Sequence, residues 1–334
     1  MSQHVAIAGA TGAVGTEFMK LLDARNYPLK SLKLLASARS AGKKIPFRGE
    51  MLEVEELTPA SFQGIDLAFF SAGGDRSKEF ASHAVDAGAL VIDNSSAFRM
   101  EPHVPLVVPE VNPEAAKQHQ GIIANPNCST IQMVVALAPI HQAAHIKRVI
   151  VSTYQAASGA GATGMQELLN QVKAYNQGEP LVPEVFQAQL LFNVIPHIDV
   201  FMDNGYTKEE MKMVHETQKI MSAPDMQIAA NCVRVPVLRS HSEAVNVETE
   251  KKITAAEARD LFSKAPGIVV KDIQEAGGYP LPWDVTETYE TYVGRIREDI
   301  STPNGIAFWV VADQLYKGAA LNALQIAEWL NKNG

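Results

Sequence analysis

The fold is decided near the N-terminus by the stretch HVAIAGATGAVG, residues 4–15. Its first half, His4 to Ala8, is a short apolar run, and residues 16–25 behind it have helical character. Glycines at positions 9, 12 and 15 stand between the two. There they permit a tight turn, close approach of a pyrophosphate to the helix N-terminus, and close packing of helix on strand. This order of strand, glycine loop and helix predicts a dinucleotide-binding unit.

Further apolar runs extend this pattern through the first 145 residues. Helix-like stretches separate them, which predicts a Rossmann-type, doubly wound parallel sheet of the α/β class. Residues 45–57 interrupt the alternation and predict a small hairpin or meander. The expected parallel strands are His4–Ala8, Ser31–Ala36, Asp66–Ala72, Ala89–Asp93 and Gly121–Ala124.

The pattern changes after about residue 146, where longer strand candidates with few helices predict an α+β second domain. Thr207 and Glu210 form a capping box that predicts a helix from there to about Met221. Residues 313–331 predict a C-terminal helix. The expected strands are Arg148–Gln155, Ile228–Val235, His241–Thr249, Thr288–Arg297 and Ile306–Val311.

Composition excludes several classes of protein. The 334 residues include 37 acidic and 29 basic side chains, a formal net charge of −8. This balance argues against a sequence-independent nucleic-acid binder. Two cysteines cannot make a disulfide framework and favour the cytoplasm. No signal peptide is expected from the first residues, and no membrane span is expected because asparagines and glutamines break the longest uncharged stretch.

The residues that follow the second expected strand indicate which cofactor binds. Many NAD-binding proteins place an acid there for the ribose hydroxyls, whereas this chain has Arg39 and Ser40. These residues suit a 2′-phosphate, so the sequence predicts NADP. The alternative is a solvated basic loop without function.

Cys128 is the strongest nucleophile candidate. Pro126 ends an extended run before it, and residues 129–138 read as a helix. A thiol at a helix N-terminus meets the positive end of the dipole, which favours the reactive thiolate. Cys232, by contrast, lies in an apolar run and is expected to be a small buried hydrophobic residue.

A cysteine nucleophile needs a base, and His241 is the most plausible of nine histidines because it stands in a polar break before a strand. Arg99, Lys212 and Arg234 are candidate anion ligands, although Lys212 with Glu209 would also fit an ordinary surface ion pair. His141 and His145 are four residues apart but lack the glutamate of a metalloprotease, so no metal site is expected.

The whole chain resembles the aspartate-β-semialdehyde dehydrogenase family. The resemblance rests on the glycine loop and on the stretches NPNCST (125–130), YQAASG (154–159), EEMK (209–212), RVP (234–236) and HSE (241–243). It implies reversible, NADPH-dependent reduction of L-4-aspartyl phosphate to L-aspartate 4-semialdehyde and phosphate, through a thioester on Cys128. This reaction serves lysine, threonine, methionine and diaminopimelate biosynthesis.

The resemblance also implies roles for individual residues. His241 would be the acid/base, Gln155 would orient the substrate, Arg234 would bind its α-carboxylate and Glu209 its ammonium group. Arg99 and Lys212 would bind phosphate. Cofactor contacts would come from Gly9, Thr11, Gly12, Ala13, Val14, Arg39, Ser40, Ser158, Gly159 and Gln314.

Because Gln314 would come from the terminal helix, the resemblance implies a discontinuous NADP-binding domain of residues 1–129 and 313–334. Residues 130–312 would form the catalytic and dimerisation domain, in a homodimer or a tetramer. Three other functions stay open at this point: a sibling reductase acting on N-acetylglutamyl phosphate, a cysteine hydrolase using Cys128 and His241, and a catalytically inactive nucleotide sensor.

Overall fold

The computed structural model describes residues 2–334, which form two compact units. Unit 1 comprises the chain up to Asn127 together with Ala319–Gly334, and unit 2 comprises Cys128–Gly318. The divisions thus fall at Cys128 and Ala319 instead of the expected 130 and 313. The first turn of a long helix keeps Cys128 in unit 2, and hydrogen bonds of Asp313 to Arg239 and of Gln314 to Ser240 hold residues 313–318 there.

Unit 1 is built on a seven-stranded sheet in the order β3-β4-β2-β1-β5-β6-β7. Its neighbours pair in parallel except for β3 and β4, which form the hairpin expected within residues 45–57. The strands are β1 (Gln3–Ala8), β2 (Leu29–Ala36), β3 (Lys44–Phe47), β4 (Glu50–Glu56), β5 (Leu67–Phe70), β6 (Leu90–Asp93) and β7 (Ile122–Ala124).

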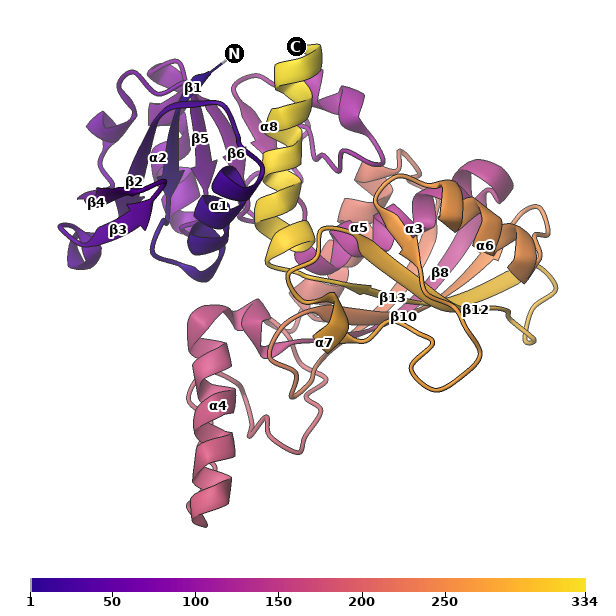
Figure 1. Cartoon of the computed structure of the whole chain (residues 1–334). Coiled ribbons are helices and arrows are strands. Elements are labelled where there is room, and N and C mark those ends of the chain that lie inside the picture. Colours follow the sequence, from indigo (N-terminus) through magenta and orange to yellow (C-terminus); the bar gives the residue numbers. More distant parts are fainter. Residues whose placement is uncertain (1) are drawn as a thin grey trace. The chain divides into compact units, whose positions relative to one another are not determined.

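Helices cover both faces of this sheet, which confirms the doubly wound prediction (Figure 1). On one face α1 (Ala13–Ala24) places Phe18 in a stack with Phe69 of β5, the ring centroids 4.5 Å apart, and α8 (Leu321–Asn333) packs beside α1. On the other face α2 (Gly74–Asp86) packs through Phe80. Because both faces are buried, the central strands are continuously apolar instead of alternating.

Unit 2 is built on a six-stranded sheet in the order β11-β12-β13-β10-β8-β9. Its pairs are antiparallel except β8 with β9 and β11 with β12, so the unit is of the expected α+β type. The elements are α3 (Cys128–Ala144), β8 (Ile146–Gln155), α4 (Gly161–Gln177), α5 (Lys208–Ile220), β9 (Gln227–Arg234), β10 (His241–Thr249), α6 (Ala255–Lys264), β11 (Ile268–Val270), α7 (Pro282–Val285), β12 (Thr291–Glu298) and β13 (Gly305–Ala312).

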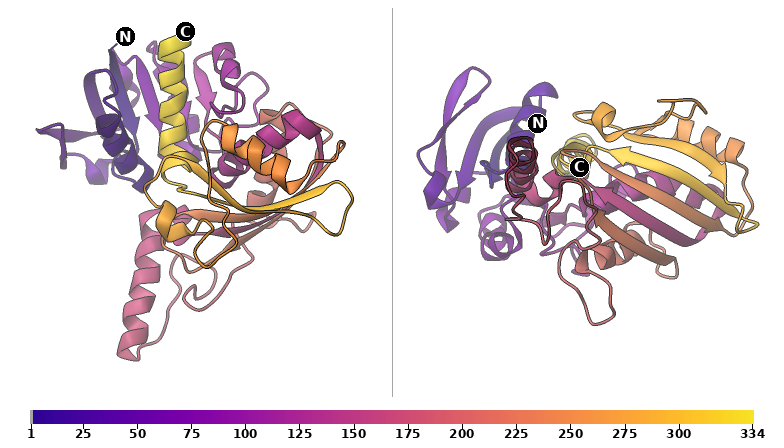
Figure 2. Two further views of the ribbon diagram at one scale, coloured as in Figure 1. Left: turned by 45° about the vertical axis from the view of Figure 1, so that its right-hand side comes forward. Right: turned by 90° about the horizontal axis from the view of Figure 1, so that it is seen from below.

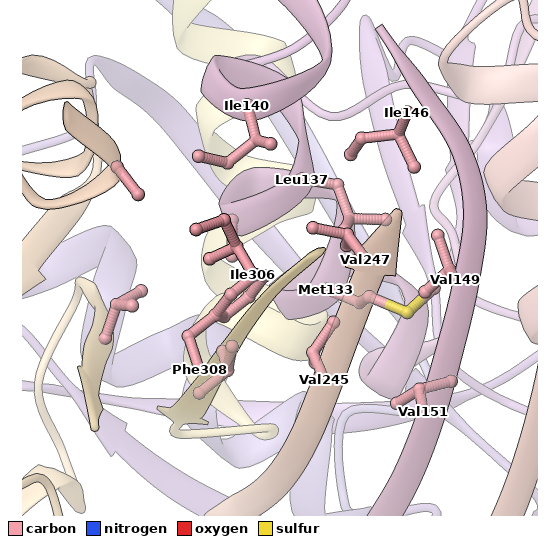
Figure 3. Packing of buried hydrophobic residues seen from close by; sticks show 14 of the residues in the cluster. Met133, Leu137, Ile140, Ile146, Val149, Val151, Val245, Val247, Ile306 and Phe308 are labelled. Carbon is pink, nitrogen blue, oxygen red and sulfur yellow. The ribbon is translucent and has the colours of Figure 1, made fainter. Parts of the chain in front are cut away.

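One face of this second sheet carries the core of unit 2. Figure 3 shows Met133 and Leu137 of α3 facing the valines of β8 and β10, with Phe308 of β13 beside them. Helices α5 and α6 pack on the same cluster through Met213 and Phe262. Helix α4, in contrast, extends away from the sheet (Figures 1 and 2). The long helix α3 is therefore anchored along the core and presents its N-terminus at a fixed place.

Several elements differ from the sequence prediction. The capping box is confirmed, since Thr207 Oγ1 accepts from the Glu210 amide at 3.3 Å and Glu210 Oε2 from the Thr207 amide at 2.7 Å. Helices α4 and α6 and the short strand β11 were not predicted. The terminal helix begins later than residue 313 because Asp313 Oδ1 accepts from two following amides, and a π-helical turn, Tyr316–Ala320, precedes α8. Within residues 2–334, no helix is long and apolar enough to cross a membrane.

Candidate active site

Cys128 is the first residue of α3, as the sequence predicted for a thiol at a helix N-terminus. The residue is partly exposed, and its thiol lies at the positive end of the helix dipole. The backbone of Gly318 packs directly against it, since a Cβ on Gly318 would lie 2.9 Å from the Cβ of Cys128. Any larger residue at 318 would displace the thiol-bearing residue. Cys232 is fully buried, and burial raises its pKa, so that thiol is the inert hydrophobic residue expected.

His241 is the first residue of β10 and is completely buried. The Ala156 amide donates to Nδ1 of the ring at 3.0 Å, so in the neutral ring the proton lies on Nε2. Burial, followed by the charge of Arg234, lowers the pKa of His241 well below its ordinary value. Nε2 itself has no hydrogen-bond partner within the described chain. The ring is therefore a neutral donor whose Nε2–H has no partner among residues 2–334.

Arg234, the last residue of β9, lies next to this histidine. A Cβ on Gly159 would lie 2.5 Å from Arg234 Nη1 and 3.2 Å from His241 Nε2, so both groups converge on the backbone of Gly159. Arg234 Nη1 donates to the Ala156 carbonyl at 2.8 Å, and the guanidinium lies 5.7 Å from the centre of the Phe186 ring. Burial lowers its pKa, and the charges of Glu209 and Cys128 oppose that shift. Arg234 is therefore a buried cation in the electrostatic field of the thiol.

Gln155 and Glu209 complete the cluster from β8 and α5. Gln155 Nε2 donates to Glu209 Oε1 at 3.2 Å, and both side chains are buried. Lys212 Nζ donates to Glu209 Oε2 at 3.0 Å and to Asp199 Oδ2 at 2.7 Å. Burial alone would lower the pKa of Lys212, but the charges of Glu209 and Asp199 raise it. This is a partly buried network of charges instead of the ordinary surface pair that the sequence also allowed.

Gln314 and Ser158 lie in unit 2 and connect to the residue that precedes His241. Gln314 Nε2 donates to Ser158 Oγ, and Gln314 Oε1 accepts from the Ser240 amide at 2.8 Å. Arg239 Nε donates to Asp313 Oδ2 at 2.7 Å in the same region. These bonds connect Ser158 and residues 239–240 to residues 313–314, which precede Gly318.

Glu243 is a polar residue of this region whose side chain sequence reasoning did not assign. It follows His241 by two positions on β10, so the two side chains point to the same face of the sheet. Its carboxyl group is fully buried, and neither oxygen has a hydrogen-bond partner of good geometry among residues 2–334. Burial raises the pKa of Glu243 well above its ordinary value, and the amide of Gln132 on α3 opposes this only in part. Burial therefore favours the protonated form of this carboxyl group.

The glycine loop of unit 1 has the geometry expected of a nucleotide cradle. Gly9 has a φ of +95°, and a Cβ there would lie 2.4 Å from the carbonyl oxygen of Ser71. A Cβ on Gly15 would lie 2.2 Å from the oxygen of Gly9. Gly12 precedes the first turn of α1, formed by Ala13 and Val14. The three glycines thus let the chain turn, let the helix pack closely and leave its N-terminus uncovered by side chains.

This loop opens onto a cavity of about 450 Å³ within unit 1. The cavity is lined by residues at the carboxyl ends of four strands, β1, β2, β4 and β5. This is the edge at which parallel sheets bind ligands. Arg39 lines the cavity, while Ser40 is not among the lining residues. Sequence reasoning missed Glu56 at the end of β4 and Arg76 in the first turn of α2. The lining residues are Gly9, Thr11, Gly12, Ala36, Ser37, Ala38, Arg39, Glu56, Leu57, Ser71, Ala72, Arg76 and Phe80.

Arg99 is a buried residue of unit 1. Its Nε donates to the Asn125 carbonyl at 3.0 Å, and Nη2 donates to the Asn94 carbonyl at 2.8 Å. These contacts hold the guanidinium at the carboxyl ends of β6 and β7. The structure thus brings Cys128, His241, Arg234, Gln155 and Glu209 together with Lys212 in unit 2, while Arg99 belongs to unit 1.

Sequence reasoning missed Asp199, Gln132, Arg239 and Asp313 besides Glu243. Asp199 has a φ of +67°, in a segment without regular structure, and no local pattern marks it as the partner of Lys212. Glu243 could have been found, because it is a charged residue within an apolar strand.

Comparisons with known proteins agree with this geometry. Residues 4–119 match the family described as "Semialdehyde dehydrogenase, NAD binding domain", and residues 137–317 match "Semialdehyde dehydrogenase, dimerisation domain". The chain is 53% identical over 331 residues to an aspartate-semialdehyde dehydrogenase of Synechocystis, covering 99% of this chain and 98% of the relative.

Solved structures give the same result. A crystal structure of aspartate semialdehyde dehydrogenase II complexed with ASA from Vibrio cholerae has a TM-score of 0.96 at 47% identity, with 99% of each chain covered. A more distant structure, aspartate semialdehyde dehydrogenase with NADP from Candida albicans, has a TM-score of 0.78 at 26% identity, again with 99% of each chain covered.

Proposed function

The chain belongs to the aspartate-semialdehyde dehydrogenase family, and we propose that it interconverts L-4-aspartyl phosphate and L-aspartate 4-semialdehyde through a thioester on Cys128. The observation that carries this proposal is the cluster in unit 2. A thiol at a helix N-terminus shares a site with a neutral buried histidine and with a buried arginine and glutamate. A cysteine hydrolase would use the first two groups but has no need of the glycine cradle in unit 1.

The nucleophilic step follows from the position of Cys128. In the reducing direction the thiolate attacks the acyl carbon of aspartyl phosphate, the carbon–oxygen bond to phosphate breaks, and a thioester forms. After the thioester carbon has been reduced, collapse of the thiohemiacetal releases the aldehyde and restores the thiolate. The dipole of α3 and the charge of Arg234 stabilise the sulfur anion before the attack and again after the thiohemiacetal has collapsed.

His241 serves the carbonyl oxygen of the thioester. Because Nδ1 is held by the Ala156 amide, Nε2–H donates a hydrogen bond to that oxygen as negative charge develops on it. In the oxidising direction attack of the thiolate on the aldehyde gives a thiohemiacetal oxyanion, and the same Nε2–H donates to this oxyanion until hydride leaves its carbon and the thioester forms. This tautomer refines the general acid/base role that the resemblance implied.

Charged groups around the thiol suit a small zwitterionic substrate. We assign the α-carboxylate to Arg234, whose fork can bind two oxygens, and the ammonium group to Glu209. Gln155, hydrogen-bonded to Glu209, orients the substrate beside the sulfur. A free ammonium group requires an acid at this place, whereas an N-acetyl group does not, so these residues favour the aspartyl over the N-acetylglutamyl substrate. Lys212 is assigned to the phosphate group.

The glycine loop beside the cavity of unit 1 suits a dinucleotide, because a Cβ on Gly9 would collide with the Ser71 carbonyl and a Cβ on Gly15 with the Gly9 carbonyl, so only glycines permit this tight turn into α1. We propose NADP as the cofactor, bound in unit 1 by Thr11 to Val14, Arg39 and Ser40. When bound in its reduced form it would supply the hydride. The NADP complex of the Candida albicans relative supports this choice over NAD. The thiolate chemistry requires a reduced cysteine, so we place the enzyme in the cytoplasm.

We propose a homodimer formed through unit 2. Large apolar side chains are exposed between residues 169 and 206, on α4 and the segments that follow it, which is unusual for a monomer. The match of residues 137–317 to a dimerisation domain supports this assignment. A monomer in light scattering at micromolar concentration would contradict it. The exposed residues are Leu169, Val172, Tyr175, Val182, Val185, Phe192, Val194, Val200, Phe201, Met202 and Tyr206.

The activity is tested with the purified protein, aspartate semialdehyde and NADP⁺, with and without phosphate. We expect NADPH formation that depends on phosphate, because phosphate is the acceptor of the acyl group. Parallel reactions with N-acetylglutamate semialdehyde and with NAD⁺ should be much slower. Phosphate-independent NADPH formation would overturn the acyl-phosphate product, and a faster reaction with the N-acetylated substrate would overturn the assignment of Glu209.

A further inference from the structure

We propose that Arg76 is a second cation for the 2′-phosphate of NADP and determines the preference of the unit 1 cavity for NADP over NAD. The inference rests on the NADP binding proposed above and adds a residue that neither the sequence motif nor the comparisons assign. Three observations carry it: the position of Arg76 in the cavity, the charges of the other lining residues, and the weakness of its present ion pair.

The position follows from the topology of the sheet. Strands β2 and β5 flank β1, and all three are parallel, so the segments that follow them meet at one edge. Arg39 lies just after β2 and Arg76 lies in the first turn of α2, which follows β5. Both line the cavity onto which the glycine loop opens. The two arginines therefore approach one ligand from the two sides of β1.

Among the charged lining residues, Arg76 determines the sign of the net charge of the cavity. Three of these residues are charged: Arg39, Arg76 and Glu56. Arg39 and Glu56 carry opposite unit charges, so without Arg76 the charged lining would sum to zero. A carboxylate at the end of a strand favours a ribose hydroxyl and disfavours a phosphate dianion. Arg76 gives the cavity a positive sign, and two guanidinium groups can bind a phosphate through several charge-assisted hydrogen bonds.

The side chain of Arg76 is available for such a ligand. Its Nη1 pairs with Glu79 at 2.8 Å, but the side chains are 53% and 54% exposed, and Glu79 does not line the cavity. An exposed pair one helical turn apart is weak and is readily replaced by a phosphate. The guanidinium carbon also lies 5.9 Å from the centre of the Phe80 ring, which itself lines the cavity. The ring and the guanidinium thus lie beside each other in the lining of the cavity.

Two nucleotide fragments test the proposal without depending on catalysis. Adenosine 2′,5′-bisphosphate and adenosine 5′-monophosphate differ only in the 2′-phosphate, and their Kd values are measured by calorimetry on the full-length protein. In Arg76→Gln we expect the bisphosphate to bind about tenfold more weakly, while the Kd of the monophosphate changes by less than about twofold. In the enzymatic assay, the KM for NADP⁺ should rise while the KM for NAD⁺ stays the same.

Lys78→Gln is the matched control, because it removes one exposed positive charge from the same helix outside the cavity. It should leave both Kd values unchanged. Glu79→Gln removes the competing carboxylate and should not weaken bisphosphate binding. Arg39→Gln should weaken bisphosphate binding as Arg76→Gln does.

The outcomes separate the inference from the proposed function. If the bisphosphate binds more tightly than the monophosphate to the native protein and Arg76→Gln changes nothing, the role of Arg76 is overturned and NADP binding stands. If Lys78→Gln has the same effect as Arg76→Gln, general electrostatics explains the result and the specific role is again overturned. If the native protein does not distinguish the two fragments, the NADP preference fails together with the inference, while the dehydrogenase activity is judged by its own assay.

Discussion

The two functional regions of this chain differ in whether backbone or buried side chains shape them. The cavity of unit 1 is shaped by backbone, with glycines where any Cβ would collide with a carbonyl group, and its charged residues are exposed. The cluster of unit 2 is made of buried side chains: His241 is 0%, Gln155 1%, Glu209 5% and Arg234 6% exposed. The folding of the first region should therefore tolerate changes of side-chain charge but not an added methyl group, whereas the folding of the second should tolerate neither.

The buried cluster is costly to assemble because charges lose their hydration when buried. Glu209 is compensated by Lys212 and Gln155, and Arg234 by the Ala156 carbonyl and the field of Glu209. Removing one member leaves another without its partner. The exposed charges of unit 1 carry no such penalty, so changes there should affect binding and leave folding intact.

The largest effect is expected from Cys128→Ser. A hydroxyl group at the same place is a far weaker nucleophile at neutral pH, so kcat should fall by about 10³-fold or more. Fragment binding in unit 1 should be unchanged, which would show that the two regions fail separately. Stopped-flow and steady-state assays measure the loss, with Cys232→Ala as a control that keeps activity. A Cys128→Ser enzyme with native rate would refute the thioester mechanism.

Arg234→Lys tests how strictly the buried cluster depends on geometry. Lysine keeps the charge but loses the planar fork and the directed bond to the Ala156 carbonyl. We expect kcat/KM for aspartate semialdehyde to fall by about 100-fold, or about 2.7 kcal/mol. Arg297→Lys, on an exposed position of β12, is the control and should lose nothing. Native kcat/KM in Arg234→Lys would show that charge alone is sufficient.

The same contrast explains what could be predicted from the sequence. The glycine loop is a local signal, since the residues that make the turn are adjacent in the chain, and the placement of Cys128 depends on a strand and a helix that are also adjacent. His241 and Arg234 had weak local signals and were assigned roles largely through the family resemblance. Asp199 and Glu243 owe their significance to contacts or burial created by distant segments. Arg76 is similar, because only the strand order places it beside Arg39.

Gly9→Ala tests the backbone-built region. The new Cβ would meet the carbonyl oxygen of Ser71 at 2.4 Å and would also require an unfavourable positive φ. We expect a loss of about 2 kcal/mol in the free energy of unfolding, together with loss of nucleotide binding. Gly64→Ala separates the two causes, because Gly64 has a φ of +71° but open space around its Cβ position. If urea unfolding gives equal losses for both variants, the collision with Ser71 contributes nothing.

Glu243→Gln should produce the smallest effect, visible in its pH dependence. Burial raises the pKa of Glu243 in the native state, so between its ordinary value and this higher one the folded protein holds a proton that the unfolded chain releases. Native stability therefore falls as pH rises through this window. Glutamine has no such proton, so the variant should gain about 1 kcal/mol over the native protein at pH 8 and less at pH 5. Urea unfolding at both pH values measures this, with Glu248→Gln on the same strand as the control. A difference that does not change with pH would mean that burial does not raise the pKa of Glu243.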